Sequence, residues 1–228
     1  CNVIMDSTFA SCYQLSRVVL PKTPYELHST FVNCHNLKEV ENLEFCTLLD
    51  NSFFSCEKLT QLNSFPPVKT IGKQTFMNCK SLESIPSLSS VEVIESRCFS
   101  NCLKLKKIEC GSELKSISSQ AFSDCSLLLS FTTSSLNYSI DFESFQRCNS
   151  LQKFDFSGCC EIQHGAFDHC TSLFEIDLSK SKISSLPYNA FSDCSSLHDI
   201  TFKSDLEYIG EMCFYNCINI TSLHFSSL

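Results

Sequence analysis

A phenylalanine that recurs every 22 to 24 residues constrains the fold of this chain more than any other feature of its sequence. A period of roughly 20 to 30 residues is typical of a solenoid, because one such unit is too small to bury its apolar face and must stack on its neighbours. We therefore expect a single solenoid domain spanning residues 1–228, with about ten repeats. The recurring residues are Phe9, Phe31, Phe53, Phe76, Phe99, Phe122, Phe145, Phe167, Phe191 and Phe214.

The two ends of the chain fall at the limits of this repeat pattern. Cys1 already lies inside a repeat, and Leu228 comes just after the last strand position of the tenth repeat. Neither end carries the polar capping repeat that a free solenoid needs for solubility. We therefore expect a segment of a longer array, uncapped at both ends.

A cysteine follows each of these phenylalanines by three residues, and apolar residues follow the cysteine at fixed distances. In the fifth repeat, Leu105, Ile108 and Cys110 lie three, six and eight residues after Cys102. Polar residues at distances five and seven alternate with the apolar ones, which is the pattern of a short strand with one face inward. One such strand per repeat predicts a parallel sheet. In three repeats the last apolar residue comes one position later, so we expect the strand to end early or bulge: Leu43, Phe65 and Leu88.

A second pair of apolar residues, spaced three apart, precedes many of the phenylalanines. Val91 and Ile94 form this pair before Phe99, and Leu114 and Ile117 form it before Phe122. This spacing predicts a brief extended piece followed by a single helical turn that leads to the phenylalanine.

Residues 117–128 and 162–178 closely match the repeat Ile-x-x-x-Ala-Phe-x-x-Cys-x-x-Leu-x-x-Ile-x-Leu-Pro. This pattern resembles the BspA-like class of leucine-rich repeats, and the resemblance covers essentially the whole chain. It implies an α/β-type leucine-rich repeat solenoid that is right-handed, with a concave parallel β-sheet and a convex side of short strands and helical turns. Proteins with such repeats are surface proteins of mucosal bacteria and protozoan parasites, implicated in attachment. The resemblance therefore implies a cell-surface or secreted location and no catalytic residues.

The 17 cysteines invite the interpretation of a disulfide scaffold, but most of them lie at core positions of the repeat. Free cysteine fills such positions well as a small apolar residue. In-register side chains also point along parallel vectors rather than toward each other, so we expect reduced thiols. Only Cys46 and Cys160 fall outside the inward positions. The predicted core ladder is Phe99, Cys102, Phe122, Cys125, Phe145, Cys148, Phe167, Cys170, Phe191 and Cys194.

One cluster of residues has the ligand types that zinc prefers: Cys159, Cys160, His164, His169 and Cys170. Cys159 and Cys170 belong to core positions, however, and His164 and His169 occupy positions that are polar in other repeats. We therefore predict no metal and no cofactor. Catalysis is disfavoured too, because the sequence contains no Gly-rich elbow or phosphate-binding loop.

The charge of the chain limits its partners. A formal net charge of -8 with only 17 scattered Lys and Arg residues argues against nucleic acid, whose phosphates need clustered basic side chains. No apolar run is long enough to span a bilayer, so direct membrane insertion by this segment is not expected.

Solenoids usually bind partners through the outward residues of their sheet. Charged residues are densest in repeats seven to nine, and we name them the charged patch: Lys153, Asp155, Glu175, Asp177, Asp199 and Lys203. We expect the charged patch to contact a polar or basic protein surface, although a solvated face without a partner is an alternative. A second candidate surface is an apolar cluster of Val19, Leu43, Phe65 and Leu88.

Two further functions remain as alternatives to a non-enzymatic recognition or adhesion module that binds a host or partner protein. Open solenoid edges are compatible with an architectural array that associates with copies of itself. A metal-dependent or hydrolytic enzyme is the more remote alternative.

Overall fold

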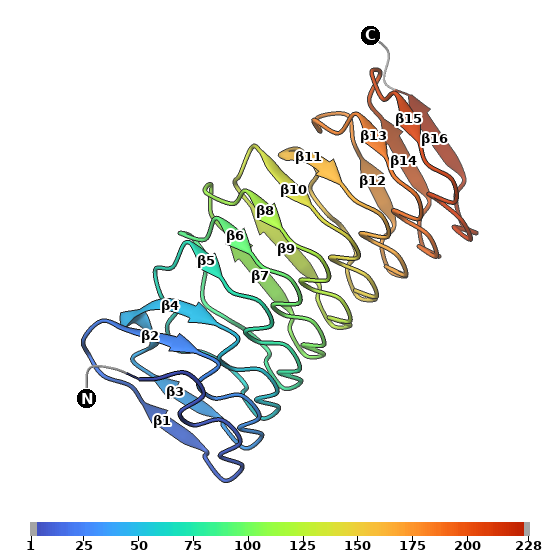
Figure 1. The fold of residues 1–228 in the computed structure, drawn as a ribbon. Helices are drawn as coiled ribbons and strands as arrows, with labels where there is room; N and C mark the ends of the chain where they lie inside the picture. The colour runs from blue at the N-terminus through green and yellow to red at the C-terminus, as the bar shows by residue number, and fades with distance from the viewer. Residues whose placement is uncertain (1–3, 226–228) are drawn as a thin grey trace.

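The computed structural model describes residues 4–225, and within that range the chain winds into one elongated coil (Figure 1). We number the turns of the coil by their phenylalanines, so Phe9 belongs to turn 1 and Phe214 to turn 10. A single apolar cluster extends from Leu20 to Cys217 through these turns. The architecture is a parallel-strand β-solenoid, as the 22 to 24 residue period predicts.

The longest sheet is built from the strands that precede the phenylalanines. Each strand pairs in parallel with its equivalent one turn away, as in Ile94 with Ile117. We call this seven-stranded arrangement, ordered β11-β10-β8-β6-β5-β4-β2, the long sheet. Its strands are β2 (Tyr25–His28), β4 (Cys46–Asp50), β5 (Thr70–Ile71), β6 (Val93–Ile94), β8 (Ser116–Ile117), β10 (Tyr138–Ile140) and β11 (Cys159–Ile162). β13 (Ser185–Leu186) and β15 (Tyr208–Ile209) form a separate pair.

The strands that follow the cysteines form a second set, which we call the interrupted sheet because it is divided into separate pieces. β1 (Arg17–Val19) pairs with β3 (Glu39–Glu41), and β7 (Lys107–Cys110) pairs with β9 (Ser130–Thr133). The third piece contains β12 (Glu175–Asp177), β14 (Asp199–Phe202) and β16 (Ser222–Phe225). Turns 3 and 4 contribute two isolated bridges in place of strands, Gln61 with Ser84 and Leu88 with Cys110. Prolines follow the residues of the first bridge, at positions 66, 67 and 86, and they lack the N–H that a longer ladder requires.

The predicted helical turns, and with them the α/β assignment, are not confirmed. Within residues 4–225 the only helix is the 3₁₀-helix η1 (Leu43–Phe45). The segment around Phe99 is instead a turn in which Arg97 and Asn101, on either side of the phenylalanine, have left-handed φ values of 57° and 64°. The N–H groups of Arg97, Phe99 and Asn101 therefore all donate to carbonyls of the next turn, at 3.0, 2.7 and 2.8 Å.

The core of the coil is a column of stacked rings. Phe122, for example, is fully buried, and its ring centroid lies 5.3 Å from that of Phe99 and 5.2 Å from that of Phe145. The cysteines of the predicted ladder, from Cys102 to Cys194, are buried beside these rings. Offset stacking of this kind adds to the stabilisation that burial of each ring provides.

The prediction that the apolar cluster forms a second binding surface is wrong. Leu43 and Leu88 are 0% and 1% exposed, and Phe65 packs against the core, whereas Val19 is 59% exposed. The extra residue in these repeats explains the difference. Asn42 takes a left-handed conformation with φ 66°, which turns Leu43 inward, and Leu88 lies in register with the inward Cys110.

Candidate interaction surface

Strands β12 and β14 position the centre of the charged patch. Ile176 of β12 and Ile200 of β14 are buried. Because side chains alternate along a strand, the residues on either side of each isoleucine face outward. Glu175 pairs in register with Asp199, and Asp177 pairs with Thr201. The interrupted sheet therefore brings carboxylates from neighbouring turns onto one open face.

Lys153 reduces the negative charge of this face at one point. Its Nζ lies 2.6 Å from Glu175 Oε1 and 4.7 Å from the centroid of the Phe174 ring. Both partners of the ion pair are about half exposed, and such surface pairs contribute at most about 1 kcal/mol to stability. The pair therefore orients Glu175 more than it stabilises the fold.

Asp155 and Asp177 have local structural roles in addition to their exposure. The Oδ1 atom of each accepts the backbone N–H of the residue two positions later, Ser157 or Ser179, at 2.9 Å. Such contacts fix the turn that follows a strand. The hydrogen bonds from Ser179 lower the pKa of Asp177, because they favour its charged form.

The remaining two members of the charged patch differ in orientation. Asp199 is exposed and accepts a hydrogen bond from the Ser222 hydroxyl in the next turn. The Lys203 side chain is only 13% exposed, and its Nζ lies 3.2 Å from Asp205 and 3.5 Å from the Ser181 carbonyl oxygen. Lys203 is therefore held by its own turn and by Ser181 rather than available at the open face.

The sequence-derived zinc cluster has its thiols engaged elsewhere. The thiols of Cys159, Cys160 and Cys170 donate to the backbone carbonyls of Glu161, Tyr138 and Phe145. The His164 ring stacks on Phe142 with a centroid separation of 5.6 Å. Among residues 4–225, the group whose potential ligand atoms do converge consists instead of Asp168, His169 and Asp193.

In that group the imidazole ring itself connects the two carboxylates. His169 Nδ1 lies 2.8 Å from Asp168 Oδ1, and its Nε2 lies 3.8 Å from Asp193 Oδ2. Asn216 also donates to Asp193 Oδ1 at 2.6 Å, and this bond is the main cause of the lowered pKa of Asp193. The arrangement links turns 8, 9 and 10. Aligning the residue before each repeat cysteine, which is His169, Asp193 or Asn216 in these turns, would have placed these side chains together.

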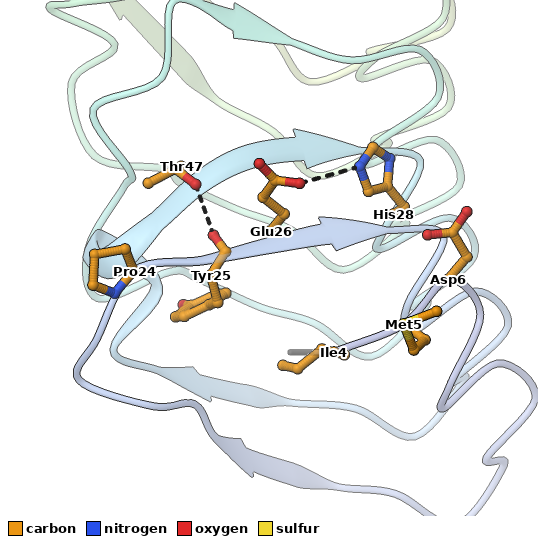
Figure 2. A pocket seen from close by; sticks show the side chains of 8 residues that line it. All are labelled: Ile4, Met5, Asp6, Pro24, Tyr25, Glu26, His28 and Thr47. Atoms are coloured by element: carbon orange, nitrogen blue, oxygen red, sulfur yellow. Dashed lines mark hydrogen bonds and ion pairs between the residues drawn. The ribbon is translucent and has the colours of Figure 1, made fainter. Parts of the chain in front are cut away.

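A hollow of about 530 Å³ lies at the N-terminal end of the coil, beside β2 (Figure 2). Its polar wall contains His28, whose Nε2 is 3.9 Å from Glu26 Oε2, and Thr47, whose hydroxyl donates to the Tyr25 carbonyl at 3.1 Å. Tyr25 itself is buried and donates its hydroxyl to the Asn42 carbonyl. The paired groups in this hollow support the ends of two strands, and they form no nucleophile–base pair.

The family model described as BspA type Leucine rich repeat region matches this chain over residues 2–129, 47–158 and 126–228, with six copies. The chain belongs to the BspA-type leucine-rich repeat family. A search of curated proteins found no match. The fold and the family are those of leucine-rich repeat proteins, which are generally non-enzymatic, and they are consistent with a protein-interaction module.

Solved structures share the fold of this BspA-type array. A leucine-rich repeat protein from T. pallidum is 27% identical, with a TM-score of 0.63, over 71% of this chain and 77% of that chain. A leucine rich cell surface protein from Faecalibacterium prausnitzii is 22% identical, with a TM-score of 0.50, over 100% of this chain and 77% of that chain. A leucine-rich repeat protein from Eubacterium ventriosum is 19% identical, with a TM-score of 0.55, over 98% and 70% of the two chains.

Within residues 4–225, no helix has the length and apolar character that crossing a bilayer requires.

Proposed function

We propose that this BspA-type array is a cell-surface recognition or adhesion module that binds a partner protein through the charged patch. The observation that supports this proposal is the in-register pairing of Glu175 with Asp199 on an open face. The interior of the same turns is filled by stacked phenylalanines and buried cysteines, which leaves the outward residues free for contacts. The partner is a host protein or another protein on the same cell surface.

The chemistry of the patch favours a polar or basic partner surface. Asp177 and Asp199 are exposed carboxylates, and the chain as a whole has a net charge of -8. Complementary charge of this kind mainly increases the association rate and the specificity, and its effect decreases as salt rises. A surface location is supported by the similarity to the Faecalibacterium prausnitzii protein, which is described as a cell surface protein.

The test reverses charges that have no role in a turn. Glu175→Lys combined with Asp199→Lys changes the open face but leaves the turn contacts of Asp155 and Asp177 intact. We expect attachment of the purified array to host cells or extracellular proteins to fall about tenfold or more, since complementary charges become repulsive. Unchanged attachment by the folded variant would exclude the patch. The matched control is Glu113→Lys with Glu207→Lys, two exposed acids outside the patch, which should leave attachment unchanged.

A further inference from the structure

A row of exposed aromatic rings follows the long sheet in turns 7 to 9. The Phe142 and His164 rings are stacked with centroids 5.6 Å apart at an interplanar angle of 5°, and the Tyr188 ring lies 6.2 Å from His164. Phe142 and Tyr188 are 46% and 42% exposed. The equivalent residues of turns 5 and 6 are Ser96 and Ser119, so the row is confined to one part of the coil. Contiguous exposed apolar groups of this kind are typical of binding surfaces.

A small acidic hollow lies directly beside this row. It has a volume of about 140 Å³ and is lined by outward residues of the neighbouring strands β8, β10 and β11 (Figure 1) and of the positions that follow them. Its polar lining is Ser116, Ser118, Ser139, Asp141, Glu161 and Gln163. The hollow meets the aromatic row at Asp141, whose Oδ1 accepts the backbone N–H of Phe142 at 2.8 Å.

The two carboxylates of the hollow keep part of their hydrogen-bonding capacity. Asp141 Oδ2 accepts the Ser119 hydroxyl at 3.1 Å, and Glu161 Oε1 accepts the Gln163 side-chain amide. An ionised carboxylate has about four acceptor positions, so each can accept further donors from a ligand. No lysine or arginine lines the hollow to neutralise them.

The segments around the hollow carry acidic residues without basic ones. Residues 138–146, 159–168 and 185–192 run from the strand to the residue after the phenylalanine in turns 7 to 9, and they contain no lysine or arginine. Their acidic residues are Asp141, Glu143, Glu161 and Asp168. Arg147 comes directly after the first segment, and its Nη1 lies 4.0 Å from Asp124 Oδ1 in the preceding turn. The corresponding segments of turns 4 and 5 contain Lys73 and Arg97. Aromatic faces and unneutralised carboxylates together favour a cation, because the negative face of a ring attracts positive charge.

We propose that the hollow and the row, together the acidic aromatic corner, bind an arginine side chain of an extended basic segment of a partner protein. The volume of the hollow accommodates the end of one side chain rather than a whole small-molecule ligand. A guanidinium group suits it better than an ammonium group, since it can donate to a carboxylate through two parallel bonds and also stack on a ring. The rest of the segment follows the rings from Phe142 toward Tyr188. This site is separate from the charged patch and does not depend on a surface location.

The test measures binding of a fluorescent nona-arginine peptide by anisotropy, with nona-lysine and a neutral hexasaccharide as comparison probes. Asp141→Asn with Glu161→Gln removes two charges but keeps an oxygen acceptor for Phe142 N–H and for Gln163, so the fold should survive. We expect this variant to weaken arginine-peptide binding about tenfold or more, as loss of charge-assisted hydrogen bonds requires. Phe142→Ala with Tyr188→Ala should weaken it about fivefold, and nona-lysine should bind less tightly than nona-arginine throughout.

Control variants separate a specific site from general attraction to an acidic protein. Glu113→Gln with Glu207→Gln removes the same charge from other exposed positions and should leave the affinity within about twofold, because distant exposed charges are screened. An equal loss in both acid-to-amide variants would overturn the proposal, as would arginine-peptide binding that is insensitive to the aromatic substitutions. Tighter binding of the neutral hexasaccharide than of nona-arginine would also overturn it, because the row would then be a carbohydrate platform. Thermal unfolding of each variant verifies that it is folded.

Discussion

The thiol of Cys102 donates a hydrogen bond to the backbone carbonyl of Phe76, one turn earlier in the coil, at an Sγ–O distance of 3.1 Å. The repeat cysteine is therefore a hydrogen-bond donor between turns as well as a small apolar residue. Only a protonated thiol can make this contact. The same contact recurs for Cys34 with Phe9, Cys56 with Phe31, Cys79 with Phe53, Cys125 with Phe99, Cys148 with Phe122, Cys170 with Phe145, Cys194 with Phe167 and Cys217 with Phe191.

Replacing Cys102 with alanine should destabilise the array by about 1–3 kcal/mol, because it removes this donor and leaves a small cavity. The Phe76 carbonyl keeps one partner, the N–H of Cys79, which limits the loss. Urea unfolding measures the change. Cys12→Ala is the matched control, since Cys12 occupies the same repeat position but is exposed, and it should change stability by less than about 0.5 kcal/mol. Equal effects of the two substitutions would contradict the role of the contact.

The thiols should be reduced and mostly unreactive in the folded protein. Cys12 is exposed and Cys160 is half-buried, whereas the other described cysteines are buried. We expect a thiol reagent to label Cys12 first and Cys160 more slowly, because only an accessible thiolate reacts. After unfolding without a reductant, close to 17 thiols should react. A much smaller number would show that disulfides exist.

The free energy of unfolding should fall at alkaline pH. Burial raises the pKa of Cys46 to about 11 and those of Cys110 and Cys159 to about 12, whereas thiols of an unfolded chain ionise near 8.5. The folded state therefore holds more protons above pH 8.5. The contribution of these thiols to the free energy of unfolding is therefore fully present below pH 8.5. It decreases as the pH rises toward the pKa values of the folded state, by at most about 1.4 kcal/mol per pH unit for each thiol. Urea midpoints between pH 8 and 9.5 should decrease, and Cys110→Ala should make the decrease shallower.

Phe122 should be among the most sensitive positions of the array. Its ring is fully buried between Phe99 and Phe145, so Phe122→Ala removes two stacking contacts and leaves a cavity. We expect a loss of about 3–5 kcal/mol in urea unfolding. Phe142→Ala changes the same residue type at a position that is 46% exposed, and it should cost less than about 1 kcal/mol. Similar losses for the two variants would contradict the stacked core.

Gly165 tests the left-handed turns. Its φ is +62°, and an added Cβ would lie 3.3 Å from Glu143 Cγ. Gly165→Ala should cost about 1–2 kcal/mol, because an L side chain disfavours this conformation. Gly165→Asn adds the same Cβ but tolerates the left-handed region better, so it should cost less than alanine. Thermal unfolding compares the two, and an equal cost would indicate that the contact with Glu143 dominates.

The period of the phenylalanines was enough to predict stacked turns and parallel strands, because both depend on which residues must be buried. The same pattern of burial could not show whether the segments around the phenylalanines are helical. Turn 5 has left-handed residues at Arg97 and Asn101, and turn 7 has them at Glu143 and Arg147. Arginine and glutamate are not residues that signal positive φ. The conformation follows instead from the inter-turn hydrogen bonds, which satisfy N–H groups that a helix would pair internally.

For the candidate surfaces, too, the sequence predicted which side chains face outward but not all of their contacts. Alternation along β12 and β14 predicted that Glu175 and Asp199 face outward, and the register brings them side by side. It could not predict that Lys203 is held by Ser181, because that contact depends on the path of the chain after β14. The sequence alone did not predict the acidic aromatic corner, because Phe142, His164 and Tyr188 taken singly belong to no motif. Comparison of the same position across turns is the signal that could have revealed it.

The sequence by itself determined the repeat, the inward residues and the stacking of turns, because an apolar pattern of this period can be buried in only one kind of arrangement. Only the tertiary structure decided which polar side chains meet, since Asp193 reaches His169, and Cys102 reaches Phe76, across 24 and 26 residues of chain. These meetings depend on distances of a few ångströms between adjacent turns. Such distances are set by the packing of the core and the left-handed turns together, and the linear order of residues does not specify them.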